Sequence, residues 1–170
     1  MSLEIIKSSV LDSGSGTTVN LVELPLGLKF VRKDYNLPGS EKLTFQTLIG
    51  YQKLTQRVSK VIEGSNLENW HVNPILFVGQ AKFPFTICPY VEGISSNQLI
   101  NTPSGKLFRL EFNEASRLLR FTFPYERIKL IALNITLTPR GQFIITNLRE
   151  YVDPTKHPIQ LFRRHRALSN

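Results

Sequence analysis

The stretch "NITLTPRGQFIITNL", residues 134–148, decides how this chain is interpreted. Two short runs of apolar and β-branched residues flank Pro139-Arg140-Gly141, a composition typical of a turn between two strands. Asn134 precedes the first run and Asn147 lies near the end of the second. The stretch therefore predicts a strand-turn-strand unit with an amide side chain at each end.

The residues before this unit show strand and helix patterns in turn. Alternating apolar residues and turn residues predict strands at 3–11, 19–24 and 28–35, and a second hairpin from 75–80 and 83–93. Helical spacing predicts a long amphipathic helix from an N-cap at Ser40 to Gly64. A shorter helix is predicted over 106–120. After it, Phe121 and Phe123 alternate as in a strand.

These elements predict an α+β fold. An N-terminal antiparallel sheet with one long packed helix is followed by a short helix and the strand-turn-strand unit. We expect a single domain over residues 1–155, made of a part at 3–93 and a part at 94–155, and then a basic tail over 156–170.

Composition excludes several classes of protein. With 41% hydrophobic and 20% charged residues, the chain is globular rather than disordered. The single cysteine cannot form an internal disulfide, and the three histidines have no zinc-ligand spacing, so we expect no bound metal. No apolar run approaches the ~20 residues needed to cross a bilayer, and the N-terminus has no signal-peptide pattern. We expect a soluble, cytoplasmic protein with no membrane partner.

The order of elements resembles the protein-kinase-like fold, including the small-molecule kinases of the aminoglycoside and choline phosphotransferase type. "FPFTICPYVEG" (83–93) resembles the last strand of a kinase N-lobe running into the hinge between the lobes. "RIKLIALNITLTPRGQFIITNLREY" (127–151) resembles the catalytic loop and the metal-binding strand-turn-strand. Because the chain ends at residue 170, the resemblance implies an N-lobe-like part followed by a reduced C-lobe.

The resemblance places amides and a lysine where a kinase carries acids. Asn134 falls at the asparagine of the catalytic loop, which puts Lys129 at the position of the catalytic aspartate. A lysine there cannot act as a general base at neutral pH without a large fall in its pKa. Asn147 stands at the aspartate of the Asp-Phe-Gly motif, where magnesium favours a carboxylate, and Arg149 adds a positive charge beside it.

The N-terminal motifs are incomplete as well. "LDSGSGTTV" (11–19) resembles a glycine-rich loop with Thr17 in place of a third glycine. On the third strand the resemblance assigns the lysine position to Arg32, with Lys33 on the opposite face, and Gln46 replaces the helix glutamate. The resemblance thus implies a degenerate nucleotide pocket without a catalytic residue or a cofactor, formed by Gly14, Gly16, Arg32, Gln46, Lys129, Asn134 and Asn147.

Positive charge gathers in the second part of the chain. Residues 1–105 carry nine Lys/Arg against eight Asp/Glu, and residues 106–170 carry twelve against five, so the second part holds +7 of the net +8. The tail mixes apolar residues with Lys156, Arg163, Arg164 and Arg166. Such a mixture favours phosphate groups or an acidic protein surface.

Three functions remain open from the sequence. The first is a non-catalytic, pseudokinase-like module that binds an acidic protein or nucleic acid through its basic half, as part of a larger complex. The second is a nucleic-acid-binding α+β domain unrelated to kinases. The third is a weak, atypical phosphotransferase.

Overall fold

The computed structural model describes residues 7–14, 17–35, 45–99, 103–126, 128 and 130–148. The chain forms two compact units. Unit 1 comprises Met1–Lys53 and Pro74–Tyr90, and unit 2 comprises Leu54–Asn73 and Val91–Asn170. Unit 2 thus includes a segment, Leu54–Asn73, that the sequence analysis placed in the N-terminal part.

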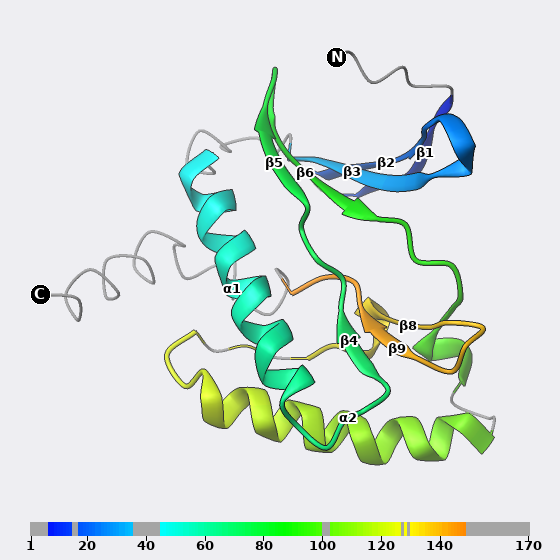
Figure 1. Cartoon of the computed structure of the whole chain (residues 1–170), viewed down its shortest axis with the longest axis vertical. Helices are drawn as coiled ribbons and strands as arrows, with labels where there is room; N and C mark the ends of the chain where they lie inside the picture. The colour runs from blue at the N-terminus through cyan, green and yellow to red at the C-terminus, as the bar shows by residue number, and fades with distance from the viewer. Residues whose placement is uncertain are drawn as a thin grey trace, which may run out of the picture. The chain divides into compact units, whose positions relative to one another are not determined.

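Unit 1 contains a five-stranded antiparallel sheet with the strand order β1-β2-β3-β6-β5 (Figure 1). Its strands are β1 (Lys7–Gly14), β2 (Thr17–Glu23), β3 (Lys29–Tyr35), β5 (Phe77–Gln80) and β6 (Pro84–Pro89). Both predicted hairpins and the third strand are confirmed, since β1 pairs with β2, β2 with β3 and β5 with β6. The long-range pairing of β3 with β6 joins the two hairpins into one sheet.

The long helix is α1 (Phe45–Glu63), which confirms the predicted amphipathic helix; the proposed N-cap at Ser40 lies outside the described residues. Its first part packs in unit 1, where a buried core is formed by Tyr35, Leu48, Ile75, Val78 and Cys88. The hydroxyl oxygens of Tyr35 and Thr86 lie 3.2 Å apart, which is within hydrogen-bonding distance. At the other end, the Gly64 amide donates to the Lys60 carbonyl directly after the helix.

Unit 2 contains a four-stranded sheet with the order β4-β9-β8-β7. Its strands are β4 (Trp70–Val72), β7 (Ile94–Ser95), β8 (Ile135–Leu137) and β9 (Phe143–Ile145). The predicted strand-turn-strand is confirmed as β8 and β9, with Gly141 at φ 78° in the turn between them. A φ of this sign suits glycine because it has no Cβ.

Strand β4 lies outside the elements predicted from the sequence. It has three residues and pairs in parallel with β9, more than 70 positions later in the chain. A strand this short has no readable alternation. Its existence depends on a partner that only the tertiary fold supplies.

The second helix is α2 (Pro103–Thr122), longer than the predicted 106–120. Phe121 belongs to the helix, so the strand suggested by the alternation of Phe121 and Phe123 is wrong. Helix α2 lies against the small sheet (Figure 1). It packs there through Phe108, whose ring lies 5.9 Å from that of Trp70 and 5.3 Å from that of Phe143. Aromatic packing of this kind holds α2 with one face buried.

The architecture confirms the predicted α+β fold, with an N-terminal antiparallel sheet and two helices. Neither described helix is long and apolar enough to cross a membrane.

Candidate functional site

The end of the β8–β9 hairpin brings Asn134 and Asn147 together. Asn134 closes a short 3-10 helix, η4 (Ala132–Asn134), directly before β8. The Thr146 amide and hydroxyl both donate to the Asn134 carbonyl, at 2.8 Å and 3.0 Å. Because Asn147 follows Thr146, the two asparagines flank one corner of the hairpin. We call Asn134, Thr146 and Asn147 the β8–β9 corner.

Arg32, assigned to the strand-lysine position, lies within a polar cluster on one face of the unit 1 sheet. Its guanidinium forms a bidentate ion pair with Asp34, with distances of 2.7 Å and 3.0 Å to Oδ1. The same guanidinium lies 4.1 Å from the centre of the Phe85 ring, and Asn20 donates to Asp34 at 3.2 Å. Charge pairing and aromatic contact together fix the position of Arg32.

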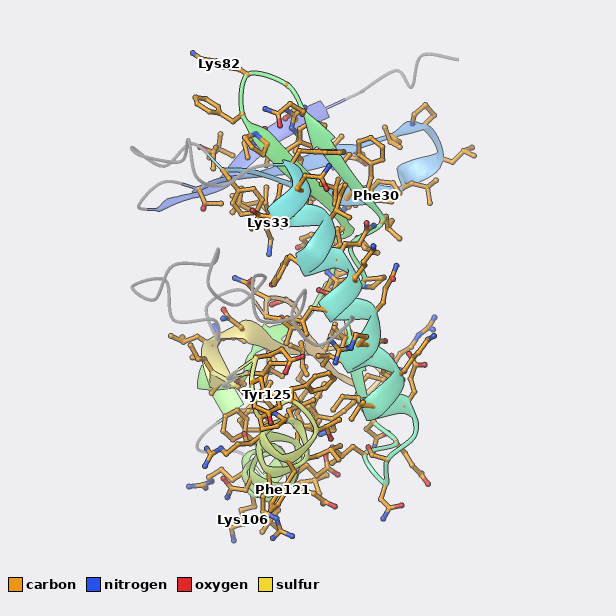
Figure 2. The ribbon with its side chains drawn as sticks, turned by 90° about the vertical axis from the view of Figure 1, so that its left-hand side faces the viewer. Phe30, Lys33, Lys82, Lys106, Phe121 and Tyr125 are labelled. Atoms are coloured by element: carbon orange, nitrogen blue, oxygen red, sulfur yellow. The ribbon has the colours of Figure 1, made fainter. Side chains whose placement is uncertain are left out.

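Lys33 lies on the other face of β3, the face that carries the unit 1 core. Side chains alternate along a strand, so Lys33 shares its face with Tyr35, which is buried in that core. Lys33 is opposite Thr86 in the register, and its charge acts on Cys88. Figure 2 labels Lys33 and Phe30, which lie on the two opposite faces of β3.

Arg32 was predicted at the strand-lysine position with Lys33 on the opposite face, and β3 does place the two side chains on opposite faces. The signal that places Lys33 on the core face is its spacing from Tyr35, an apolar residue on the same face. Asp34, two residues after Arg32, marks the opposite face as polar.

The other predicted pocket residues belong to separate elements or lie outside the described residues. Gly14 ends β1 and pairs with Thr17 across the hairpin. Gln46 is exposed on α1, whereas Phe45 and Ile49 pack against the core. Gly16 and Lys129 lie outside the described residues, as do the tail cations Lys156, Arg163, Arg164 and Arg166. A nucleotide pocket formed by this set stays a prediction.

No protein-family model matches the chain, and no curated protein matches it. Among solved structures, it is similar to an apo pseudokinase at 13% identity, over 82% of this chain and 53% of that one, with a TM-score of 0.48. It is also similar to PpkA-294 in its apo form at 11% identity, over 92% and 61%, with a TM-score of 0.50. The fold is kinase-like. At these identities the likeness concerns the fold alone, and the chain spans little more than half the length of each neighbour.

The kinase-like fold implies magnesium at the β8–β9 corner, but the residues there do not fit it. The side chains of Asn134 and Asn147 offer only neutral amide oxygens. The backbone carbonyl of Asn134 already accepts two hydrogen bonds from Thr146. Magnesium bound by proteins normally has at least one carboxylate ligand. Over the described part of the chain, no group of three or more His, Cys, Asp or Glu side chains could hold a metal ion. We derive no chemical step through a metal at this corner.

Cys88 is a buried thiol in the unit 1 core. Burial raises the pKa of Cys88 above its ordinary value, while the charge of Lys33 and a hydrogen bond with Thr86 act in the opposite direction. Because the thiolate is the reactive form, both the burial and the raised pKa suppress reactivity.

We therefore expect native Cys88 to react with iodoacetamide more than about tenfold slower than the unfolded chain. Since Cys88 is the single cysteine, mass spectrometry of the intact protein reports this site alone. A folded pKa above the unfolded one means that the native state holds the proton longer, so stability should fall as the pH rises through the unfolded thiol pKa. Equal labelling rates in buffer and in denaturant would contradict the burial.

Proposed function

We propose that the chain is a non-catalytic, pseudokinase-like module that acts by binding an anionic partner, within a larger assembly. The observation that carries this proposal is the β8–β9 corner, where the kinase-like fold has its magnesium ligands and this chain has two asparagines. The resemblance to the aminoglycoside and choline phosphotransferase type belongs to the same proposal.

The chemistry of phosphoryl transfer supports this conclusion. Catalysis in that reaction depends on positioning and on electrostatic stabilisation by metal ions, together with an aspartate that accepts the proton of the substrate hydroxyl. In this chain the resemblance assigns Lys129 to the aspartate position and Asn147 to the metal-binding position. Without either carboxylate, binding remains as the function that the fold can perform.

The charge distribution supports an anionic partner. Residues 106–170 hold +7 of the net charge of +8, and a charge of this sign raises the association rate with acidic proteins or nucleic acid. The predicted contacts of Lys156, Arg163, Arg164 and Arg166 are part of this proposal. A nucleic-acid-binding role and a weak, atypical phosphotransferase remain as rivals that the following experiment separates.

We expect the purified protein with ATP and magnesium to show no phosphotransfer or hydrolysis above a protein-free blank. The double variant Lys129→Asp/Asn147→Asp should gain magnesium-dependent nucleotide binding, because it restores both acids. At a ligand concentration of 100 times the Kd, such binding stabilises the folded state by about 2.7 kcal/mol, which a thermal shift detects.

The matched control is Asn113→Asp, which adds one carboxylate at an exposed position of α2. It should show no magnesium-dependent shift with ATP. Turnover by the unmodified protein would overturn the non-catalytic proposal and favour the phosphotransferase. A thermal shift of equal size in the control would show that the β8–β9 corner is not the cause of the shift in the double variant.

A further inference from the structure

One face of α2 carries exposed cations interleaved with two large apolar side chains. At ~100° per residue, seven residues fall within about 120° of the helix circumference. We call them the α2 basic stripe: Lys106, Arg109, Leu110, Asn113, Arg117, Arg120 and Phe121. All seven are exposed. The stripe is therefore a continuous accessible surface of the described helix.

The packing of α2 determines which face this is. Phe108, Ala115 and Leu119 are buried on the opposite side, at 5%, 0% and 0% exposure. Leu110 and Phe121 are 71% and 80% exposed. Figure 2 shows Lys106 and Phe121 extending from the same side of α2, although they lie near its two ends.

The stripe contains four cations and no acid. Of the two glutamates of α2, Glu111 accepts a hydrogen bond from the buried Trp70 at 2.8 Å, away from the stripe. Glu114 lies beyond the edge of the stripe, next to Leu110 and Phe121. The Arg109 Nε donates to the Gly105 carbonyl at 3.3 Å, which leaves the positive charge of Arg109 in place. A surface of this sign attracts an anionic partner.

Leu110 and Phe121 add a second requirement for a partner, which is apolar side chains that can cover them. They are eleven positions apart in the sequence, which is about three helical turns or ~16 Å, and they lie on nearly the same line along α2. Both side chains are largely exposed and flanked by arginines, and phenylalanine and arginine are enriched at protein–protein interfaces. Burial of either side chain under a partner would stabilise the complex.

We infer that the α2 basic stripe binds an acidic segment of another protein that presents two apolar side chains about three helical turns apart. This inference rests on the proposed function, since it names the surface and the class of the anionic partner. Charge complementarity attracts the segment, and burial of Leu110 and Phe121 fixes its register.

The charges of the chain itself exclude the nearest alternative occupants. Residues 149–170 carry five Lys/Arg against two Asp/Glu, so the C-terminal segment would be repelled by the stripe. A second copy has a net charge of +8, and two stripes facing each other would place like charges together. A partner with a different, acidic sequence is required.

Two other anionic partners fit less well. Interfaces with nucleic acid are polar and rich in ordered water, so they would leave Leu110 without an apolar contact. Helices that lie in a membrane interface insert a continuous apolar face. In α2 that face is already buried against Trp70 and Phe143 through Phe108.

The test uses the full-length protein and four probes. The first probe is a synthetic glutamate-rich helical peptide with two leucines about three helical turns apart, and the second is the same peptide with both leucines replaced by glutamine. The others are a DNA duplex and vesicles of phosphatidylcholine with phosphatidylserine. Fluorescence anisotropy measures the first three, and co-sedimentation measures the vesicles.

Two stripe variants separate the charge from the apolar contribution. Lys106→Gln/Arg117→Gln removes two cations, and Leu110→Gln/Phe121→Gln removes both apolar side chains. The matched controls are Lys53→Gln/Lys60→Gln, two exposed lysines of α1, and Leu133→Gln, an apolar residue 62% exposed outside the stripe. Because all substituted side chains are exposed, the variants should fold, which circular dichroism verifies.

We expect the leucine peptide to bind more tightly than the glutamine peptide, the duplex and the vesicles. Each stripe variant should weaken it about tenfold or more, while the controls change it less than about twofold. Equal binding of the two peptides, unchanged binding by Leu110→Gln/Phe121→Gln, or tighter binding of the duplex or of the vesicles would overturn the inference.

Two further measurements distinguish failure of this inference from failure of the proposed function. Suppose that Arg163→Ala/Arg164→Ala/Arg166→Ala abolishes peptide binding while both stripe variants bind normally. The proposal of an anionic partner would then hold, and the inference that the α2 basic stripe binds it would be wrong. Phosphotransfer by the unmodified protein would overturn the non-catalytic proposal even if the peptide binds the stripe.

Discussion

The Trp70→Ala variant is expected to lower the free energy of unfolding by about 3–5 kcal/mol, as large-to-small changes of buried aromatic residues do. Trp70 is 1% exposed. Its ring packs between Phe108 and Phe143, with centroid distances of 5.9 Å and 5.3 Å. Alanine would leave a cavity between α2 and β9, and it would also leave Glu111 without its indole donor.

Chemical denaturation followed by circular dichroism measures this effect, because Trp70 is the single tryptophan and its fluorescence disappears in the variant. Trp70→Phe keeps most of the packing and removes the hydrogen bond, so it should cost clearly less. Phe121→Ala is the matched surface control, with an expected change within about 0.5 kcal/mol, since Phe121 is 80% exposed. A loss below about 1 kcal/mol for Trp70→Ala would show that Trp70 does not hold α2 on the sheet.

Gly93→Ala is expected to destabilise the protein by about 2–4 kcal/mol, because a Cβ at this position has no room. An added Cβ would lie 2.2 Å from the Leu137 carbonyl oxygen and 2.9 Å from its carbon, and both are backbone atoms. The positive φ of 156° adds strain for any residue with a side chain. Gly93 directly precedes β7, so relief of the clash would separate β7 from β8.

Hydrogen exchange at Ile94 and Ser95, together with the denaturation midpoint, measures this separation. The control is Gly64→Ala, where the nearest atom to the new Cβ, the Lys60 carbonyl oxygen, lies at 3.3 Å and φ is not in the left-handed range. It should change stability by less than about 1 kcal/mol. At Gly79 the obstacle is the Phe85 ring at 2.2 Å, a side chain that can rotate, so alanine there should cost less than at Gly93. Wild-type stability of Gly93→Ala would contradict the close approach of the two backbones.

The candidate site could be anticipated only in part. Asn134 and Asn147 are identifiable from the hairpin between them, because a two-strand unit with a short turn brings its own ends together. The choice between Arg32 and Lys33 was not available from that local pattern. It depends on which face of β3 packs on a helix, and the buried Tyr35 marks that face.

The α2 basic stripe could not be read from the sequence for a related reason. Leu107, Leu110, Leu118 and Leu119 all suit a helical core, yet Leu119 is 0% exposed and Leu110 is 71% exposed. The docking of Phe108 on Trp70 rotates the helix so that Leu110 faces outward. Tertiary contacts of this kind separate an apolar core residue from an apolar anchor on the surface.

The sequence by itself determined the elements whose signals are local. Alternation and turn residues specified β1, β2, β3, β5, β6, β8 and β9, and helical periodicity specified α1 and α2, since neighbouring side chains carry those patterns. Tertiary structure decided β4, the joining of β3 to β6 and the outward face of α2. These features arise from pairings between distant segments, and a strand or a helix face is stabilised there by its partner rather than by its own residues.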